Sequence, residues 1–251
     1  MKKTPENSFE ILPPTNDWVF KLLFGDERNK SMLIDLLQSL VELPKEDFEL
    51  IYLDPHLKKE FEKDKLGILD VKVKTASGKI INIEIQVNPQ DFIGKRISYY
   101  KSKLVLGQIK EGEKYEVIQK VICICITCYP LFPNKKEYLN VFRFYNPKNN
   151  LLFEKIPEEI ITLEIPKLPE YNDGSPLYNW LKFLGSNTRE DFEMVAKSNA
   201  EINKAVETLF RLNADEQVRA IYDARMMAQL DRNSQLHTTH HLFNRYNQVP
   251  C

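Results

Sequence analysis

Residues 121–126 have the sequence Val-Ile-Cys-Ile-Cys-Ile, and this run constrains the fold more than any other segment of the chain. It is too short for an ordinary helix and rich in β-branched residues, which pack well in strands. A strand that is apolar at every position is expected at the centre of a sheet with both faces covered. We therefore predict a strand within residues 117–127 of a layered α/β protein.

Amphipathic segments around this strand predict the layers that would cover it. Apolar residues recur at helical spacing in residues 17–24, where Asn16 or Asp17 would be the cap, and in residues 29–41 and 90–109. Further strands are predicted at residues 68–75, 79–87, 138–145 and 160–165, and further helices at 177–184, after the Thr188 cap, at 200–212 and at 215–230. This order predicts an α/β core, with a mixed sheet flanked by helices, in residues 1–166 and a helical C-terminal region in residues 167–251.

The composition excludes several classes of protein. An aromatic content of 11% and a net charge of -1 argue against a disordered chain, and only 8 glycines exclude a collagen-like one. No apolar run approaches the ~20 residues of a membrane helix. The polar N-terminus lacks the apolar stretch of a signal peptide, so the expected compartment is the cytoplasm, with no membrane partner. With a net charge near zero, any nucleic-acid site must be a local patch.

Three of the four cysteines, Cys123, Cys125 and Cys128, lie in or beside the predicted central strand. Their C-x-C-x2-C spacing allows a zinc site, but no second cluster accompanies it, and we favour small buried hydrophobes. The histidines of residues 237–241 also lack a nearby carboxylate or cysteine. We interpret that segment as a frayed tail, because threonine disfavours a helix.

The most informative segment is the predicted hairpin of residues 68–87. Asp70 and Lys72 share a face of the first strand, while Asn82, Glu84 and Gln86 share a face of the second. A three-residue loop at 76–78, with glycine in the left-handed conformation, makes the numbers of paired residues add up to 154. That register places Asp70 directly opposite Glu84, whereas a two-residue loop would leave the two acids diagonal.

Two carboxylates that face each other on a sheet repel, and this cost is understandable if a cation lies between them. Magnesium takes oxygen ligands, and a bound metal ion can activate water and stabilise charge on a phosphate. An exposed polar hairpin face, on which Lys72 and Lys74 neutralise the acids, explains the spacing equally well.

Several segments together give the chain a resemblance to a known family. Asp70, followed by a hairpin and Glu84-x-Gln86, resembles the signature of PD-(D/E)XK nucleases, with glutamine where lysine is commonest. More specifically, residues 16–231 resemble the Rpn family of recombination-promoting nucleases, also described as PD-(D/E)XK nuclease family transposases. The matching segments are Asn16-Asp17-x-x-Phe20-Lys21-x-Leu23-Phe24-Gly25, Leu69-Asp70-Val71, Asn82-Ile83-Glu84-Ile85-Gln86, Arg96-x-x-Tyr99-Tyr100, Gly112-x-x-Tyr115 and Trp180-x-x-Phe183-Leu184.

This resemblance implies a restriction-endonuclease-like core and a metal-dependent DNA endonuclease linked to recombination or mobile elements. Its implied cofactor is Mg²⁺ or another divalent cation, and its implied partner is DNA. Asp70 and Glu84 match the metal-binding carboxylates, and Gln86 matches the position where lysine would polarise the attacking water. Glutamine can only orient that water by hydrogen bonding. Lys72, on the strand face of Asp70 by parity, would supply the missing charge.

Two groups of supporting residues have alternative interpretations. Asp17 would be an auxiliary metal ligand, as in many nucleases of this superfamily, or a plain helix cap that pairs with Lys21; we slightly favour the cap. In the helix at residues 90–109, Arg96, Tyr99 and Lys103 share a face that suits contact with DNA phosphates, and equally suits a solvated helix surface.

The alternative function is a catalytically inactive DNA-binding or protein-interaction module of a mobile element. Gln86 and the near-zero net charge are compatible with it, and a homodimer is left open. The feature that discriminates between the two functions is whether the carboxylates of Asp70 and Glu84 converge.

Overall fold

The computed structural model describes residues 11–56 and 70–246. The chain divides into two compact units, Met1–Thr208 and Leu209–Cys251. The first unit contains the whole sheet and the helices that cover it, and the second consists of the end of one helix and the long helix after it. The predicted boundary at residue 166 stays a prediction.

A mixed six-stranded sheet forms the centre of the first unit, in the order β1-β2-β3-β4-β8-β5. The three inner strands, β3, β4 and β8, run parallel to one another, and the outer pairs are antiparallel. The strands are β1 (Ile51–Tyr52), β2 (Val71–Lys74), β3 (Ile80–Gln86), β4 (Val121–Thr127), β5 (Leu139–Phe142) and β8 (Glu158–Glu164). Strands β6 (Tyr145–Asn146) and β7 (Leu151–Leu152) form a separate two-stranded ribbon.

Strand β4 confirms the prediction of a central strand covered on both faces. All seven of its residues are buried, and it is hydrogen-bonded to β3 on one side and β8 on the other. Cys123 and Cys125 lie within it as free, buried thiols, and burial raises the pKa of each to about 12. At this pKa both side chains are neutral at physiological pH, as expected for small buried hydrophobes.

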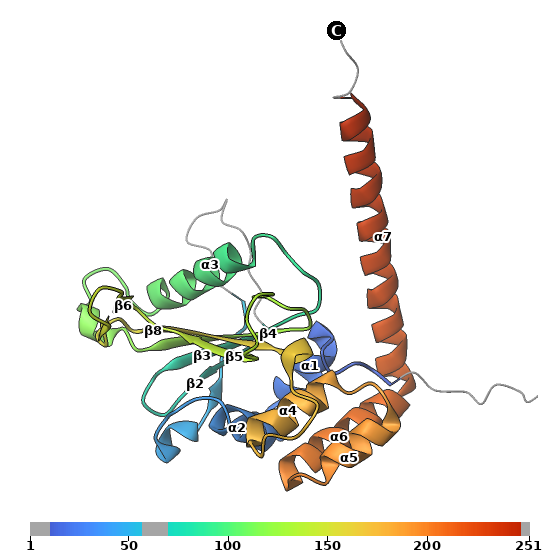
Figure 1. Cartoon of the computed structure of the whole chain (residues 1–251), viewed down its shortest axis with the longest axis horizontal. Coiled ribbons are helices and arrows are strands. Elements are labelled where there is room, and N and C mark those ends of the chain that lie inside the picture. The colour runs from blue at the N-terminus through green and yellow to red at the C-terminus, as the bar shows by residue number, and fades with distance from the viewer. Residues whose placement is uncertain (1–10, 57–69, 247–251) are drawn as a thin grey trace, which may run out of the picture. The chain divides into compact units, whose positions relative to one another are not determined.

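Helices cover both faces of the sheet (Figure 1). Helix α3 (Ile93–Leu106) lies on one face, and α1 (Asp17–Phe24), α2 (Lys30–Gln38) and α4 (Pro176–Gly185) lie on the other. The mixed sheet with helices on both faces confirms the predicted α/β fold.

An aromatic cluster unites the layer of α1, α2 and α4. Phe24 of α1 packs edge-on against Trp180 of α4, with ring centroids 5.7 Å apart. The Trp180 indole is completely buried, and its Nε1 donates a 2.8 Å hydrogen bond to Asp35 of α2. Asn199 donates a second bond to the same oxygen of Asp35. The first helical segments therefore pack directly against residues that follow more than 140 positions later.

Several element boundaries differ from those predicted. A 3-10 turn, η1 (Glu27–Asn29), precedes α2, and another, η3 (Tyr115–Val117), precedes β4; η2 (Lys45–Phe48) and η4 (Ile165–Lys167) are further short turns. The remaining helices are α5 (Arg189–Ala196), α6 (Ala200–Ala214) and α7 (Glu216–Tyr246). Because α7 includes residues 237–241, the interpretation of this segment as a frayed tail is wrong. Threonine destabilises a helix by only about 0.5 kcal/mol per residue relative to alanine, and neighbouring residues of higher helix propensity can offset this cost.

Among the helices in the described part of the chain, none is long and apolar enough to cross a membrane.

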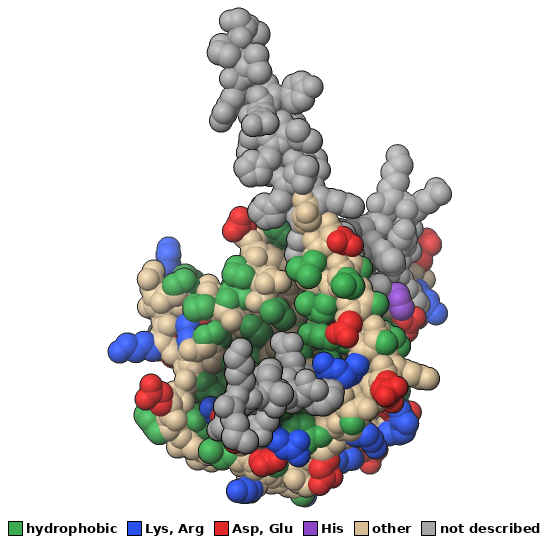
Figure 2. Space-filling view, turned by 90° about the vertical axis from the view of Figure 1, so that its right-hand side faces the viewer, with side chains coloured by type: hydrophobic (Ala, Val, Ile, Leu, Met, Phe, Trp, Pro, Cys, Tyr) green, Lys and Arg blue, Asp and Glu red, His purple; other side chains and the backbone are tan. Residues whose placement is uncertain are grey.

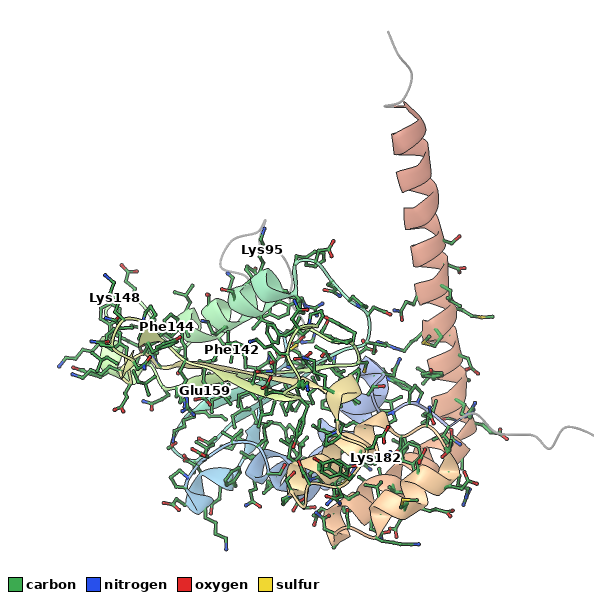
Figure 3. All side chains as sticks on the ribbon, in the orientation of Figure 1. Lys95, Phe142, Phe144, Lys148, Glu159 and Lys182 are labelled. Atoms are coloured by element: carbon green, nitrogen blue, oxygen red, sulfur yellow. The ribbon has the colours of Figure 1, made fainter. Side chains whose placement is uncertain are left out.

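On the face drawn in Figure 2, the described basic and acidic side chains are interspersed rather than separated into areas of one sign. Charged groups also enter the sheet layer: Glu159 of β8, labelled in Figure 3, is buried and pairs with Lys120 and Arg143.

Candidate active site

The turn between β2 and β3 sets which residues face the candidate site. Gly78 has a φ of +89°, in the left-handed region, and its N–H donates to the Thr75 carbonyl at 2.9 Å. Asp47 fastens the turn, because its carboxylate accepts the Ser77 N–H at 2.9 Å and pairs with Lys79. The resulting pairs, such as Val73–Ile81 and Lys72–Asn82, have the predicted register. Residues 82, 84 and 86 of β3 are thereby directed toward α3.

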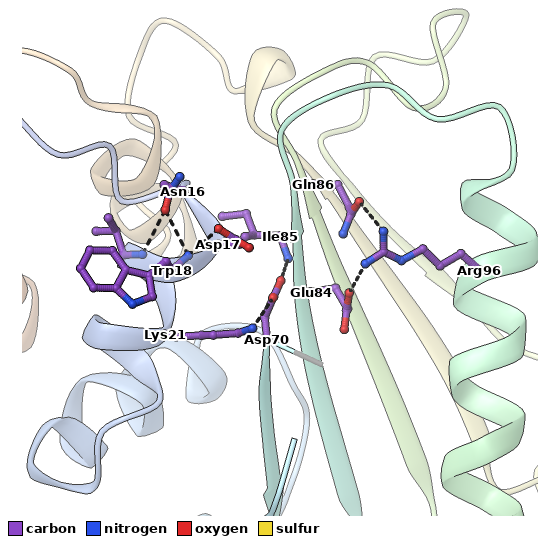
Figure 4. A network of polar contacts seen from close by, with 10 residues as sticks. Asn16, Asp17, Trp18, Lys21, Asp70, Glu84, Ile85, Gln86 and Arg96 are labelled. Atoms are coloured by element: carbon purple, nitrogen blue, oxygen red, sulfur yellow. Dashed lines mark hydrogen bonds and ion pairs between the residues drawn. The ribbon is translucent and has the colours of Figure 1, made fainter. Parts of the chain in front are cut away.

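Asp70 lies one residue before β2, so the ladder ends before it would pair Asp70 with Glu84. Its carboxylate instead accepts the N–H of Ile85 at 2.8 Å and contacts Lys21 Nζ of α1 at 3.3 Å. Figure 4 shows Asp70 between Lys21 and Ile85, while Glu84 extends toward α3. The expectation of two carboxylates directly opposite on one sheet face is therefore wrong, because the free end of β2 lets Asp70 turn toward the backbone of β3.

Glu84 and Gln86 share the side chain of Arg96, which extends from the first turn of α3 (Figure 4). Arg96 Nη2 lies 3.3 Å from Glu84 Oε2, and its Nη1 lies 3.5 Å from Gln86 Oε1 and 3.4 Å from Gln90 Oε1. The guanidinium also lies over the ring of Tyr100, 5.2 Å from its centroid. Glu84 is only 7% exposed, whereas Arg96 is 29% exposed. Arg96 thus contacts both Glu84 and Gln86 and is also partly exposed at the protein surface.

Burial dominates the electrostatics of both acids. The pKa of Glu84 is raised to about 7 in all: burial is the largest cause and the negative charge of Asp70 adds to it, while Arg96 and the Asn82 side chain act in the opposite direction. Burial also raises the pKa of Asp70, although the Ile85 N–H and the Lys21 ammonium lower it. Because the charge of Asp70 acts on Glu84, the two carboxyl groups are close enough to interact. A pair of buried acids with raised pKa values is more typical of a functional site than of a structural ion pair.

The two oxygens of the Glu84 carboxylate differ in their surroundings, and Oε2 is the one that contacts Arg96. The Glu84 Oε1 atom is buried and has no hydrogen-bond partner among the described residues, and the same is true of Asn82 Oδ1. Both side chains line a cavity of about 10 Å³ under α3, together with Tyr100 and Cys125. This volume is close to that needed for one water-sized particle. Unpartnered carboxylate oxygen near a second carboxylate fits the ligand preference of a divalent cation such as Mg²⁺.

The described side chains contain no group of three His, Cys, Asp or Glu residues arranged to hold a metal ion. The two acids and further oxygen ligands, such as water and substrate phosphate, would have to complete the coordination. Magnesium sites commonly have this composition, with one or two carboxylates and several waters.

The structure places the remaining predicted site residues at the edge of this arrangement. Asn16, not Asp17, caps α1, accepting the N–H groups of Trp18 and Val19. Asp17 is exposed, but its charge raises the pKa of Asp70, so it lies near the acids. Lys72 donates to the Asp54 carbonyl at 3.3 Å, and the cations in contact with the two acids are instead Lys21 and Arg96.

Tyr99 and Lys103 are half-buried on α3, and the Tyr99 ring contacts that of Tyr100. The expectation that Arg96, Tyr99 and Lys103 bind DNA phosphates stays a prediction, and Arg96 is directed at the acids.

Three residues of the site were missed in the sequence or given another role. The sequence predicts a pair of Lys21 with Asp17, whereas Lys21 contacts Asp70 in the structure. Asn82 is expected on the face of Glu84 from its parity in β3, but the sequence does not indicate that it lines a cavity there. Gln90 contacts Arg96, which follows it by six residues. This spacing does not by itself predict a contact, because the contact depends on where α3 begins.

A family model described as "PD-(D/E)XK nuclease family transposase" matches residues 14–239. Searches of curated proteins and of solved structures gave no match. The match covers the hairpin, both acids and α3, and its extent agrees with the range over which the sequence resembles this family.

Proposed function

This chain belongs to the PD-(D/E)XK nuclease family transposases, and on that premise we propose that it hydrolyses phosphodiester bonds in DNA with a divalent cation, in recombination or in the movement of a mobile element. We also propose that the protein acts as an endonuclease and that it does so in the cytoplasm. One observation carries the proposal: the carboxyl groups of Asp70, just before β2, and of Glu84, in the neighbouring strand β3, are largely withdrawn from solvent and interact, and Glu84 retains an unpartnered oxygen.

Asp70 and Glu84 are the residues that would hold the cation, for which we propose Mg²⁺. When bound, the ion supplies a more acidic water and positive charge at the reacting phosphate. Asp70 is fixed for this role by the N–H of Ile85. Glu84 is fixed by its place in β3, because Ile83 and Ile85 on either side of it are buried in the opposite layer.

Gln86 is proposed to orient the attacking water. Its amide can donate and accept a hydrogen bond but carries no charge, so it cannot replace the lysine found at this position in many related enzymes. Lys21 and Arg96 provide positive charge on the two sides of the acids instead.

The test is cleavage of supercoiled plasmid by the purified full chain with MgCl2, with EDTA, and with the variants Asp70→Asn and Glu84→Gln. We expect EDTA and either variant to reduce cleavage by at least about 10²-fold, because each removes a group that stabilises charge in the transition state.

The matched control is Asp47→Asn. Like Asp70, Asp47 accepts a backbone N–H and pairs with a lysine, but it does so at the other end of the hairpin. This variant should therefore retain metal-dependent cleavage at a temperature where it is folded. Cleavage that survives in Asp70→Asn, or that is lost equally in Asp47→Asn, would refute the assignment of the site.

An inactive DNA-binding module is the second candidate, and the ion pairs of the acids with Lys21 and Arg96 favour it, because they neutralise the acids without a metal ion. A folded protein that binds DNA in a gel-shift assay but never cuts it with Mg²⁺ or Mn²⁺ would support this candidate.

A further inference from the structure

Arg96 is in contact with the acidic site, but its contacts are longer than the ion pairs that the buried acids of β8 make. Its contacts with Glu84, Gln90 and Gln86 measure 3.3, 3.4 and 3.5 Å. Charge-assisted hydrogen bonds are ordinarily about 2.7–2.9 Å long. By comparison, Lys167 lies 2.6 Å from Glu164, and Lys120 lies 3.0 Å from Glu159. Arg96 is therefore held by three long contacts rather than by one close pair.

The hydrogen-bonding capacity of Arg96 is also incompletely used. Its Nε atom is buried and has no hydrogen-bond partner within the described part of the chain, and the facing Glu84 Oε1 is in the same condition. A guanidinium in a finished structural pair commonly uses two parallel N–H groups on one carboxylate. Here a single Nη atom contacts a single carboxylate oxygen.

The position of Arg96 suits movement between two partners. Its guanidinium lies over Tyr100, which supports the planar group without fixing it by hydrogen bonds. The side chain is 29% exposed, whereas that of Glu84 is 7% exposed. Arg96 thus extends from the buried acid to the surface at which a DNA backbone would arrive, and arginine binds phosphate oxygens in the same planar manner as carboxylate oxygens.

We propose that Arg96 is a displaceable counter-ion of Glu84: a divalent cation that binds Glu84 competes with the guanidinium, and the released guanidinium binds the substrate phosphate and supplies the positive charge that Gln86 lacks. The proposal deepens the proposed function and rests on it for the phosphate. The competition between two cations for one carboxylate does not depend on cleavage.

The test combines Mg²⁺ binding, measured by titration calorimetry at pH 9, with plasmid cleavage kinetics for the wild type, Arg96→Gln and Arg96→Lys. We expect Arg96→Gln to bind Mg²⁺ about threefold to fivefold more tightly, because a partly exposed competing charge is removed. The same variant should lose cleavage by about 10²-fold in kcat. Arg96→Lys should recover part of the cleavage, because it restores a charge but not the planar fork. A merely structural arginine would give weaker Mg²⁺ binding together with weaker cleavage.

Lys101→Met is the matched control, since Lys101 is a basic residue of the same helix, is buried, and pairs with Glu158, outside the site. It should leave the Mg²⁺ dissociation constant unchanged. Circular dichroism of each variant checks the fold, and Arg96→Lys keeps the test valid if Arg96→Gln does not fold.

The outcomes separate this inference from the proposed function. Tighter Mg²⁺ binding by Arg96→Gln in a protein that never cleaves DNA would support the counter-ion role and reject the nuclease. Unchanged or weaker Mg²⁺ binding by Arg96→Gln, in a protein whose cleavage depends on Asp70 and Glu84, would overturn the inference alone. An equal change in Lys101→Met would also overturn it.

Discussion

Glu84→Gln is predicted to make the protein more stable at alkaline pH and to abolish the proposed cleavage. In the folded protein, burial raises the pKa of Glu84 from 4.5 to about 7. A raised pKa means that folding favours the neutral acid, so the contribution of Glu84 to stability is most favourable below pH 4.5 and is lost as the pH rises through 7. Each pH unit between the two pKa values corresponds to about 1.4 kcal/mol, which gives a total cost of about 3 kcal/mol above pH 7.

Glutamine has nearly the same shape and never ionises, so this cost disappears in the variant. The free energy of unfolding of Glu84→Gln, relative to wild type, should rise by about 3 kcal/mol between pH 4 and pH 8.5. For a chain of this size, that corresponds to a Tm difference of about 6–12 °C. The assay is urea denaturation in EDTA at several pH values, followed by circular dichroism.

Glu159→Gln is the control of opposite sign. Glu159 is also buried, but its pairs with Arg143 and Lys120 outweigh burial and lower its pKa. Its removal should destabilise the protein at pH 8.5 and matter less in acid, as expected for a lowered pKa. If the free energy of unfolding has the same pH dependence in wild type and Glu84→Gln, or if the variant is less stable than wild type at pH 8.5, the claim that burial of the ionised Glu84 destabilises the fold is refuted. Added MgCl2 should stabilise the wild type and not Glu84→Gln.

Two further predictions concern the glutamine of the motif and the helical layer. Gln86→Lys should lower the pKa of Glu84, because it places a second cation beside this acid. The acidic limb of the pH–rate profile of the proposed cleavage should then move to lower pH, and a profile whose acidic limb stays in place would mean that residue 86 does not face Glu84. Trp180→Phe should reduce the free energy of unfolding by about 2–3 kcal/mol, because it removes both the hydrogen bond to Asp35 and part of a fully buried ring. The measurement is urea denaturation, and a change under ~0.5 kcal/mol would contradict the role given to this indole.

Much of the fold could be predicted because local signals agreed with one another. The all-apolar run at residues 121–126 predicted a central strand, and Gly78 predicted the turn that fixes the register of the hairpin. The family could be recognised from motifs spread along most of the chain. Each of these signals depends on the order of residues along a short segment.

The details of the site could not be predicted in the same way. Parity assigned Asp70 to the face of Glu84, but parity applies only within a strand, and β2 begins at Val71. The contacts of Lys21 with Asp70 and of Arg96 with Glu84 connect different layers, so they depend on how the helices dock onto the sheet. Lys72, which parity favoured as the missing charge, donates to a backbone carbonyl of residue 54.

The contact of α4 with α1 and α2 has a consequence for how this protein folds during synthesis. The residues of the acidic site leave the ribosome early, but β8, the neighbour of the central strand, is not available before residue 164, and Trp180 comes later still. Until then Phe20, Phe24 and the inner face of the sheet lack part of their cover. Nonlocal pairing of this kind slows folding and leaves apolar surface exposed on the growing chain. A nascent chain that ends before α4 would therefore expose this apolar surface to chaperones and proteases, and any activity of the acidic site has to wait until residues 176–185 have been synthesised.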